Sequence, residues 1–260
     1  MQHPSDPVEP PSDYDAFAWV YDRHWGRHSL QKFTPILTER LLPRLPAGAR
    51  VLDVCCGTGQ IARWFSDQGF RVTGLDASRA MLGYAQERAP AAEFMLADAR
   101  NFSRPPDHAA AVSMFDSLNH ILSLNELETA FRCIQAALAP GGIFFCDFNM
   151  RQKFAGGWKG DFSIVEDDLA CIVRTQYEDS TRLARWEVTF FRRNETWERT
   201  DLVLTQRMYE EDEIVRALSA AGFSRIRAWD ALHPPECGTA LPPGKTYFMA
   251  DKATNIGEPA

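Results

Sequence analysis

A glycine-rich turn preceded by an acidic residue is the first feature of this sequence that could carry chemistry. The segment "VLDVCCGTGQIA" (51–62) runs from an apolar stretch through Gly57 and Gly59 into a helical pattern. Such a loop binds the polar part of a nucleotide cofactor through backbone N–H groups and the start of the helix. Asp53 lies four residues before Gly57, where its carboxylate would repel a pyrophosphate and attract an ammonium group. The loop therefore favours a positively charged cofactor and disfavours a nicotinamide dinucleotide.

Two further acidic residues follow the next two apolar stretches. Asp76 lies 23 residues after Asp53, where a carboxylate can accept hydrogen bonds from both hydroxyls of a ribose. Asp98 can accept from the exocyclic amine of an adenine, with the backbone of Ala99 and Arg100 nearby. Taken singly, Asp76 or Asp98 is as typical of a turn or a helix cap. Acids after three successive stretches together describe one adenosine ligand with a positive end.

A histidine follows the fourth apolar stretch, in "FDSLNHI" (115–121). An imidazole with an unperturbed pKa of about 6.5 is suited to accept a proton, so His120 is a candidate general base. We expect Asn119 and, with a weaker claim, Asp116 to contact a substrate. A capping or packing role for His120 stays an equally open alternative, and Asp116 can equally serve a turn.

These residues need a fold that brings the ends of several strands together. Apolar stretches alternate with amphipathic helical patterns from residue 49 onward, which predicts an α/β fold with a doubly wound, mainly parallel sheet. In such a sheet the ligand binds at the carboxyl ends of the strands. The expected strands are Arg50–Cys55, Arg71–Asp76, Glu93–Ala97, Ala110–Phe115 and Ile143–Phe148, and the expected helices are Gly59–Gln68, Ser78–Arg88 and Glu126–Leu138.

The pattern changes after Asn149, where Trp186, Val188 and Phe190 alternate with polar residues. This period is typical of a half-exposed antiparallel strand, so we expect an antiparallel β insertion after the fifth strand. A helix over Glu211–Ala221 and strands near Ser224–Ala231 and Thr246–Ala250 then complete the main sheet. The expected division is a disordered leader (1–13), a cofactor-binding core with an N-terminal helical lid (14–150), the insertion (151–208), the rest of the core (209–252) and a flexible tail (253–260).

Composition limits the class of function. The net charge of −7 disfavours wide contact with nucleic acid, because such contact depends on Lys and Arg. No stretch reaches the roughly 20 apolar residues of a membrane span, and the first residues do not resemble a signal peptide. The six cysteines contain no C-x-x-C pair, which favours reduced thiols over a zinc site. We therefore expect a cytoplasmic protein that acts on a small molecule and holds no metal.

An ordered series of motifs resembles that of the class I S-adenosylmethionine-dependent methyltransferases: "VLDVCCGTGQ", "VTGLDASRAML", "LADAR", "FDSLNHI" and "LAPGGIFFCDFN". The resemblance covers residues 14–150 and implies a Rossmann-like seven-stranded sheet with S-adenosyl-L-methionine as cofactor and S-adenosyl-L-homocysteine as product. The insertion is similar to that of the sugar-amine N,N-dimethyltransferases. This similarity implies a small-molecule acceptor with an amine or hydroxyl nucleophile, and it leaves monomer and homodimer both open.

The resemblance also implies roles for individual residues. The cofactor-binding residues would be Tyr14, Tyr21, Asp53, Cys55, Gly57, Gly59, Asp76, Ala77, Met81, Asp98, Ala99, Arg100 and Phe115, and the substrate side would be formed by Trp25, Asp116, Asn119 and His120. Tyr14, Phe17, Tyr21 and Trp25 stand at helical spacing, which is typical of a lid over the site or equally of a helix that packs on the core.

Two alternative functions remain open. An RNA-modifying methyltransferase would use the same cofactor site, although the acidic balance of the chain disfavours it. A non-catalytic protein that binds S-adenosylmethionine would keep the glycine loop and lose the groups on the methyl side. The presence of Asn119, His120 and the two tyrosines disfavours that alternative.

Overall fold

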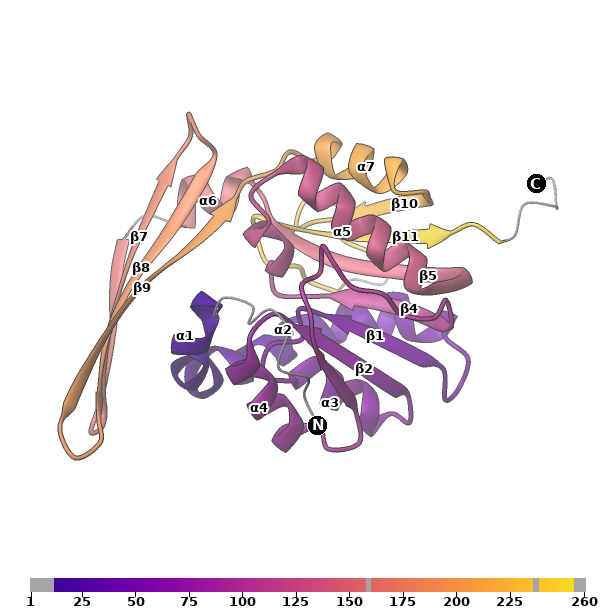
Figure 1. Ribbon diagram of the computed structural model, residues 1–260. Coiled ribbons are helices and arrows are strands. Elements are labelled where there is room, and N and C mark those ends of the chain that lie inside the picture. The colour runs from indigo at the N-terminus through magenta and orange to yellow at the C-terminus, as the bar shows by residue number, and fades with distance from the viewer. Residues whose placement is uncertain (1–11, 158–159, 236–238, 255–260) are drawn as a thin grey trace, which may run out of the picture.

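The computed structural model describes residues 12–157, 160–235 and 239–254. Its largest element is a seven-stranded sheet with the order β10-β11-β5-β4-β1-β2-β3 (Figure 1). The strand β11 runs antiparallel to β5 and β10, and the other neighbours are parallel. The expected fold class is therefore confirmed. The strands are β1 (Arg50–Val54), β2 (Arg71–Asp76), β3 (Glu93–Leu96), β4 (His108–Ser113), β5 (Leu138–Asn149), β10 (Phe223–Trp229) and β11 (Lys245–Lys252).

The expected strand ends are wrong at β4 and β5. The chain leaves β4 at Ser113, and Phe115 and Asp116, close behind it, adopt φ values of 71° and 51°. These left-handed conformations are incompatible with a strand, so the expected extension to Phe115 is replaced by a turn. The strand β5 begins at Leu138, before the expected Ile143, because Leu138 already pairs with His108 of β4.

Helices and helical turns cover both faces of the sheet. One apolar core holds Phe33 and Phe65, and the other holds Phe131 and Leu218. The first lies under α2 (Arg27–Ile36), η2 (Leu37–Leu41), η3 (Leu42–Arg44) and α3 (Gln60–Asp67), and the second under α5 (Leu124–Ala137) and α7 (Glu211–Ala220). The helix α4 (Arg79–Arg88) begins after Ser78, whose side chain accepts from the N–H of Met81. Burial of these two faces leaves the carboxyl ends of the strands free for a site.

The second glycine of the loop is required by close packing between two helices. Gly59 has φ 82°, and a Cβ placed on it would lie 2.8 Å from Cα of Ala85 in α4. A side chain here would therefore clash with backbone as well as strain its own φ. Gly59 allows α3 to begin directly beside α4.

The inserted segment forms a second, antiparallel sheet with the order β6-β7-β8-β9. Its strands are β6 (Gly160–Glu166), β7 (Leu169–Glu178), β8 (Leu183–Arg193) and β9 (Trp197–Arg207), which follow the short helix α6 (Arg151–Gly157). The alternation expected from the sequence is present, because Val188 and Phe190 are buried and their neighbours are not. In Figure 1 this sheet stands beside the main domain with α1 next to it.

The N-terminal helix α1 (Asp13–Tyr21) lies between the inserted sheet and the main domain. Phe17 and Val20 pack against the apolar face of the inserted sheet. On the other side, Asp15 accepts from the hydroxyl of Ser78 at 2.6 Å and from the N–H of Ala80 at 3.0 Å. A helical turn, η1 (Asp22–Gly26), continues α1. The expected leader and tail fall largely outside the described residues, at 1–11 and 255–260.

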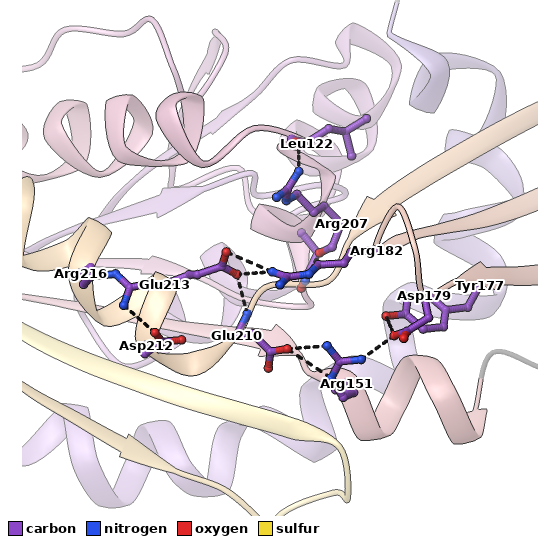
Figure 2. Close-up of polar contacts among 11 residues, drawn as sticks. Leu122, Arg151, Tyr177, Asp179, Arg182, Arg207, Glu210, Asp212, Glu213 and Arg216 are labelled. Atoms are coloured by element: carbon purple, nitrogen blue, oxygen red, sulfur yellow. Dashed lines mark hydrogen bonds and ion pairs between the residues drawn. The ribbon is translucent and has the colours of Figure 1, made fainter.

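Ion pairs attach the far end of the inserted sheet to the main domain. Figure 2 shows Arg151 of α6 between Asp179, after β7, and Glu210, before α7. Arg182 pairs with Glu213 of α7 at 3.0 Å. The inserted sheet is thus held at α1 and again at α6 and α7.

The cysteines, possible metal ligands and helix lengths bear on the expectations drawn from composition. Five cysteines lie among the described residues and all are free, while Cys237 lies outside them. The described residues contain no group of three or more His, Cys, Asp and Glu side chains that could hold a metal ion. None of the described helices is long and apolar enough to cross a membrane.

Candidate active site

A cavity of about 260 Å³ opens at the carboxyl ends of the strands, under α1 and beside the inserted sheet. All of the site residues expected from the sequence line it except Asp53, Gly59 and Asn119. It is lined by Ser12, Tyr14, Phe17, Tyr21, Trp25, Cys55, Gly57, Asp76, Ala77, Met81, Asp98, Ala99, Arg100, Phe115, Asp116, Ser117, His120, Ile121, Trp186, Leu204 and Gln206. The last three belong to the insertion, and no sequence motif indicated them.

Asp76 organises the glycine loop. Its carboxylate accepts from the N–H of Gly57 at 2.8 Å and from the N–H of Ser78 at 2.9 Å. Burial raises the pKa of Asp76, and these hydrogen bonds oppose that rise. The carboxylate at the end of β2 therefore connects the loop after β1 to the start of α4, at the wall of the cavity.

Among its described lining residues, the cavity has acidic side chains but no Arg or Lys that lacks an acidic partner. Arg100 is the one Arg or Lys in the described lining, and it pairs with Asp98 at 2.6 Å and with Glu126 at 2.9 Å. The hydrogen bonds from Arg100 lower the pKa of Asp98 and keep it ionised. The carboxylate of Asp98 is thus already paired with Arg100. Any amine that binds beside Asp98 would have to share this carboxylate with Arg100.

Asp53 lies behind this wall. It lines a smaller pocket that shares Tyr21, Cys55 and Phe115 with the main cavity. Burial, together with the nearby Asp76, raises the pKa of Asp53 to about 8. Within the described residues its Oδ2 atom has no hydrogen-bond partner. An unpartnered, buried carboxylate of this kind is suited to a ligand that carries a positive charge.

His120 lies in the turn η4 (Ser117–His120), where both ring nitrogens have partners. Its Nδ1 is 2.8 Å from the carbonyl oxygen of Thr205, which can only accept, so Nδ1 carries the proton. Its Nε2 is 2.9 Å from the hydroxyl of Tyr14. Burial lowers the pKa of His120, although Asp116 opposes that shift. The imidazole is therefore neutral, with the lone pair of Nε2 on the cavity side.

A buried ion triad supports the loop that carries His120. The ammonium of Lys245 lies 2.5 Å from Asp116 and 2.5 Å from Asp147. The second oxygen of Asp116 accepts from Nε2 of Gln206 at 2.6 Å. Both oxygens of Asp116 are therefore occupied by groups of the protein, although the residue lines the cavity where the sequence placed it.

The structure does not bring Asn119 to the cavity. Its side chain is fully buried and donates to the carbonyl oxygens of Asn149 and Arg207, at 3.2 Å and 2.8 Å. Its oxygen accepts from the N–H of Asn149. Asn119 holds the loop to β5 and β9, and its expected contact with a substrate has no support in this geometry.

One side of the cavity has an aromatic wall. The ring of Trp25 lies with its centroid 5.2 Å from that of Phe17 and 6.0 Å from that of Trp186. Trp25, in η1, therefore borders the cavity beside the inserted sheet, and its expected contact with a substrate stays a prediction.

The sheet order is that of a Rossmann-like fold, and the acidic cavity at the carboxyl ends of its strands is suited to a cationic cofactor. A family model described as "Methyltransferase domain" matches residues 26–227. The chain belongs to this family and is a class I S-adenosylmethionine-dependent methyltransferase, which confirms the resemblance seen in the sequence.

Proteins with a similar sequence include a putative methyltransferase, YqeM, of Bacillus subtilis (strain 168). It is 28% identical over 249 residues, which cover 94% of this chain and 98% of YqeM. A dTDP-3-amino-3,4,6-trideoxy-alpha-D-glucopyranose N,N-dimethyltransferase of Streptomyces venezuelae is 34% identical over 142 residues, 54% of this chain and 60% of that protein.

Solved structures show the same architecture over most of the chain. Streptomyces venezuelae DesVI aligns with a TM-score of 0.73 and 27% identity, over 91% of this chain and 98% of DesVI. The amino pentose methyltransferase CalS10 of Micromonospora echinaspora, solved with S-adenosylmethionine bound, aligns with a TM-score of 0.71 and 25% identity, over 90% of this chain and 96% of CalS10.

Proposed function

We propose that this enzyme methylates an amine of a small molecule and that His120 takes up the proton that the amine must lose. The observation that carries the proposal is the neutral imidazole of His120, whose Nε2 lone pair meets the Tyr14 hydroxyl at the cavity wall. The acidic lining supports an amine, since an approaching ammonium is attracted there. Two relatives are named as N,N-dimethyltransferases of amino sugars.

The cofactor residues expected from the sequence are proposed to hold S-adenosylmethionine in two parts. Asp76, Met81 and Asp98 lie on the wall proposed for the ribose and adenine. Asp53 and Tyr21 line the pocket behind, which is proposed for the cationic end. The fit rests on the charge of the lining and on the orphaned oxygen of Asp53.

The chemistry demanded of the protein is then limited. When bound, S-adenosylmethionine supplies a methyl group on a positive sulfur, and a bond from the amine nitrogen to carbon forms as the C–S electron pair stays on sulfur. A protonated amine has no lone pair, so one proton must leave it first. Tyr14 can accept that proton while its own passes to Nε2 of His120, and the aromatic wall excludes water from the nitrogen.

The test combines an acceptor screen with a matched pair of histidine variants. A library of small amines, phenols and alcohols is incubated with S-adenosylmethionine labelled in the methyl group, and products are identified by mass spectrometry. With the best acceptor, His120→Ala should reduce kcat by roughly 100-fold and spare cofactor affinity. His233→Ala, at an exposed histidine outside the cavity, should retain full activity. Methylation of hydroxyls only, or of RNA, would contradict the proposal.

A further inference from the structure

A glutamine of the inserted sheet contacts the nitrogen of His120 that is proposed to take the proton. Gln206 lies in β9, is 4% exposed and lines the cavity. Its Nε2 atom is 3.1 Å from Nε2 of His120 and 2.6 Å from Oδ2 of Asp116. The neighbouring residue of β9, Thr205, accepts from Nδ1 of His120. The insertion thus holds both ring nitrogens of His120.

The orientation of the Gln206 amide follows from its neighbours. Its Oε1 accepts a hydrogen bond from the side-chain nitrogen, Nδ2, of Asn149 at 3.2 Å. The other oxygen of Asp116 accepts from the ammonium of Lys245, so both oxygens of this residue act as acceptors. A reversed amide would place an oxygen 2.6 Å from a carboxylate oxygen, which is repulsive. Gln206 therefore presents its N–H groups to Asp116 and to His120.

This arrangement opposes a proton on Nε2 of His120. In the neutral ring, Nε2 has one lone pair, toward which both Tyr14 and Gln206 can donate. If Nε2 gains a proton, the Tyr14 hydroxyl can rotate and accept. The Gln206 amide cannot, because its nitrogen has only donors, so two N–H groups would face each other at 3.1 Å.

Charged groups around His120 act in the opposite direction and are partly screened by Gln206. Asp116, after β4, favours a protonated imidazole, and the amide of Gln206 lies between the two. Behind Asp116 stand Lys245 of β11 and Asp147 of β5, which pair with each other. Tyr14 of α1 is the remaining titratable group in direct contact. Removal of the Gln206 N–H groups would end the repulsion with a proton on Nε2 of His120. It would also let the charge of Asp116 act more strongly on His120.

We infer that Gln206 is a positioning residue that keeps His120 neutral with its proton on Nδ1 and lowers the affinity of Nε2 for a proton. The inserted sheet would then set the pH range in which the proposed base works. The inference rests on the proposed function only for this catalytic consequence, since the contact itself concerns the protein alone.

The experiment measures the pKa of His120 directly, by NMR titration of protein labelled in histidine, as isolated and with S-adenosylhomocysteine. Gln206→Met keeps similar length and removes both donors, so the pKa should rise by about one unit, a tenfold gain in proton affinity. Gln206→Glu can accept from Nε2 and should raise it further. Gln176→Met, at an exposed glutamine of β7, is the matched control and should change nothing. An unchanged or lower pKa in a folded Gln206 variant overturns the inference.

The pH profile of turnover separates this inference from the proposed function. If His120 is the base, the acidic limb of kcat in Gln206→Met moves to higher pH by the same amount as the NMR titration. If Gln206 had a purely structural role, Gln206→Met would lower kcat at every pH and would shift neither limb of the pH profile. If the NMR value moves and the limb does not, Gln206 acts as inferred and the proposed role of His120 is wrong.

Discussion

The hydroxyl oxygen of Tyr14 lies 2.9 Å from Nε2 of His120, so the first helix and the loop after β4 meet at a single nitrogen. Their rings also pack edge to face, with centroids 5.3 Å apart. The contact joins residues 106 positions apart in the chain. The proposed proton path therefore requires α1 in the position seen here.

Tyr14→Phe should separate these two roles of the tyrosine. The ring and its packing remain, so α1 should stay in place, and any loss of affinity for S-adenosylmethionine reports a contact of the hydroxyl with the cofactor. The path to His120 loses its hydroxyl, and kcat should fall by roughly 10- to 100-fold. Steady-state kinetics and calorimetry check this, with Tyr84→Phe in α4, outside the cavity lining, as control. Full turnover in Tyr14→Phe would show that the hydroxyl carries no proton.

Asp53→Asn should alter the pH dependence of stability. The pKa of Asp53 is about 8 in the folded protein against an ordinary value of 3.8, so the folded state binds the extra proton between these values. The free energy of unfolding therefore falls as pH rises through this window. Asp53→Asn should flatten the decline in urea denaturation at pH 6 and pH 8. An equal slope in both proteins would show that Asp53 titrates normally.

The same carboxylate should couple binding to protons. A cationic ligand favours the ionised form of Asp53, so binding of S-adenosylmethionine near pH 7 should release a proton and strengthen as pH approaches 8. Calorimetry in buffers of different ionisation enthalpy measures the proton released. Asp53→Asn should bind more weakly and release none, whereas an unchanged release would place the titrating group elsewhere.

Asp76→Ala should weaken binding of S-adenosylmethionine and S-adenosylhomocysteine by about 1–3 kcal/mol. The change removes the proposed acceptor for the ribose and also the acceptor for the N–H groups of Gly57 and Ser78. Asp67→Ala removes an exposed acid of α3 and is the control. Calorimetry with both ligands checks the effect, and the wild type should show no binding of NAD. Equal affinities in wild type and Asp76→Ala would remove this residue from the cofactor site.

Lys245→Met should destabilise the fold by about 3–5 kcal/mol, because it leaves Asp116 and Asp147 buried without their shared cation. Burial already raises the pKa of Asp147. Protonation at lower pH should therefore relieve part of the loss, and the deficit should be smaller at pH 5 than at pH 7. Urea denaturation at both values measures it. The double variant Lys245→Met, Asp147→Asn should recover stability; failure to do so would mean that charge is not the cause.

The sequence leaves monomer and homodimer both open, and association through the inserted sheet is a testable prediction. The face of the inserted sheet opposite α1 carries exposed Val165, Ile172, Trp197 and Val203. Light scattering should give twice the chain mass of 29.4 kDa if two such faces associate. Ile172→Glu should then yield monomers. A strict monomer at high concentration would leave the sheet with its role in the cavity alone.

The cofactor side of the site could be predicted from the sequence, because parallel strands deliver the residues that follow them to one edge. Asp76 and Asp98 reach the cavity for this reason. Asn119 does not, although it is adjacent to His120. Successive residues of the tight turn η4 point about 120° apart, so one side chain faces the interior and the next the cavity.

Gln206 and Lys245 could not be predicted in the same way. The alternation in β9 could assign Gln206 to one face of a sheet, but the contact with His120 depends on how that sheet docks. Lys245 belongs to β11, whose place beside β5 follows from the topology of the whole sheet. Contacts between segments this distant carry no local signal, since many sequences satisfy the same local pattern.

The hydrogen bonds between β9 and η4 affect when the loop that carries His120 can become ordered during synthesis. His120 bonds to Thr205, 85 residues later, and Asn119 bonds to Arg207, 88 residues later. A nascent chain that ends after β5 already contains the glycine loop and all four parallel strand pairs of the main sheet. The loop with His120 still lacks its partners in β9. We therefore expect the core to collapse first and the loop with His120 to become ordered last, after the insertion and β11 have emerged.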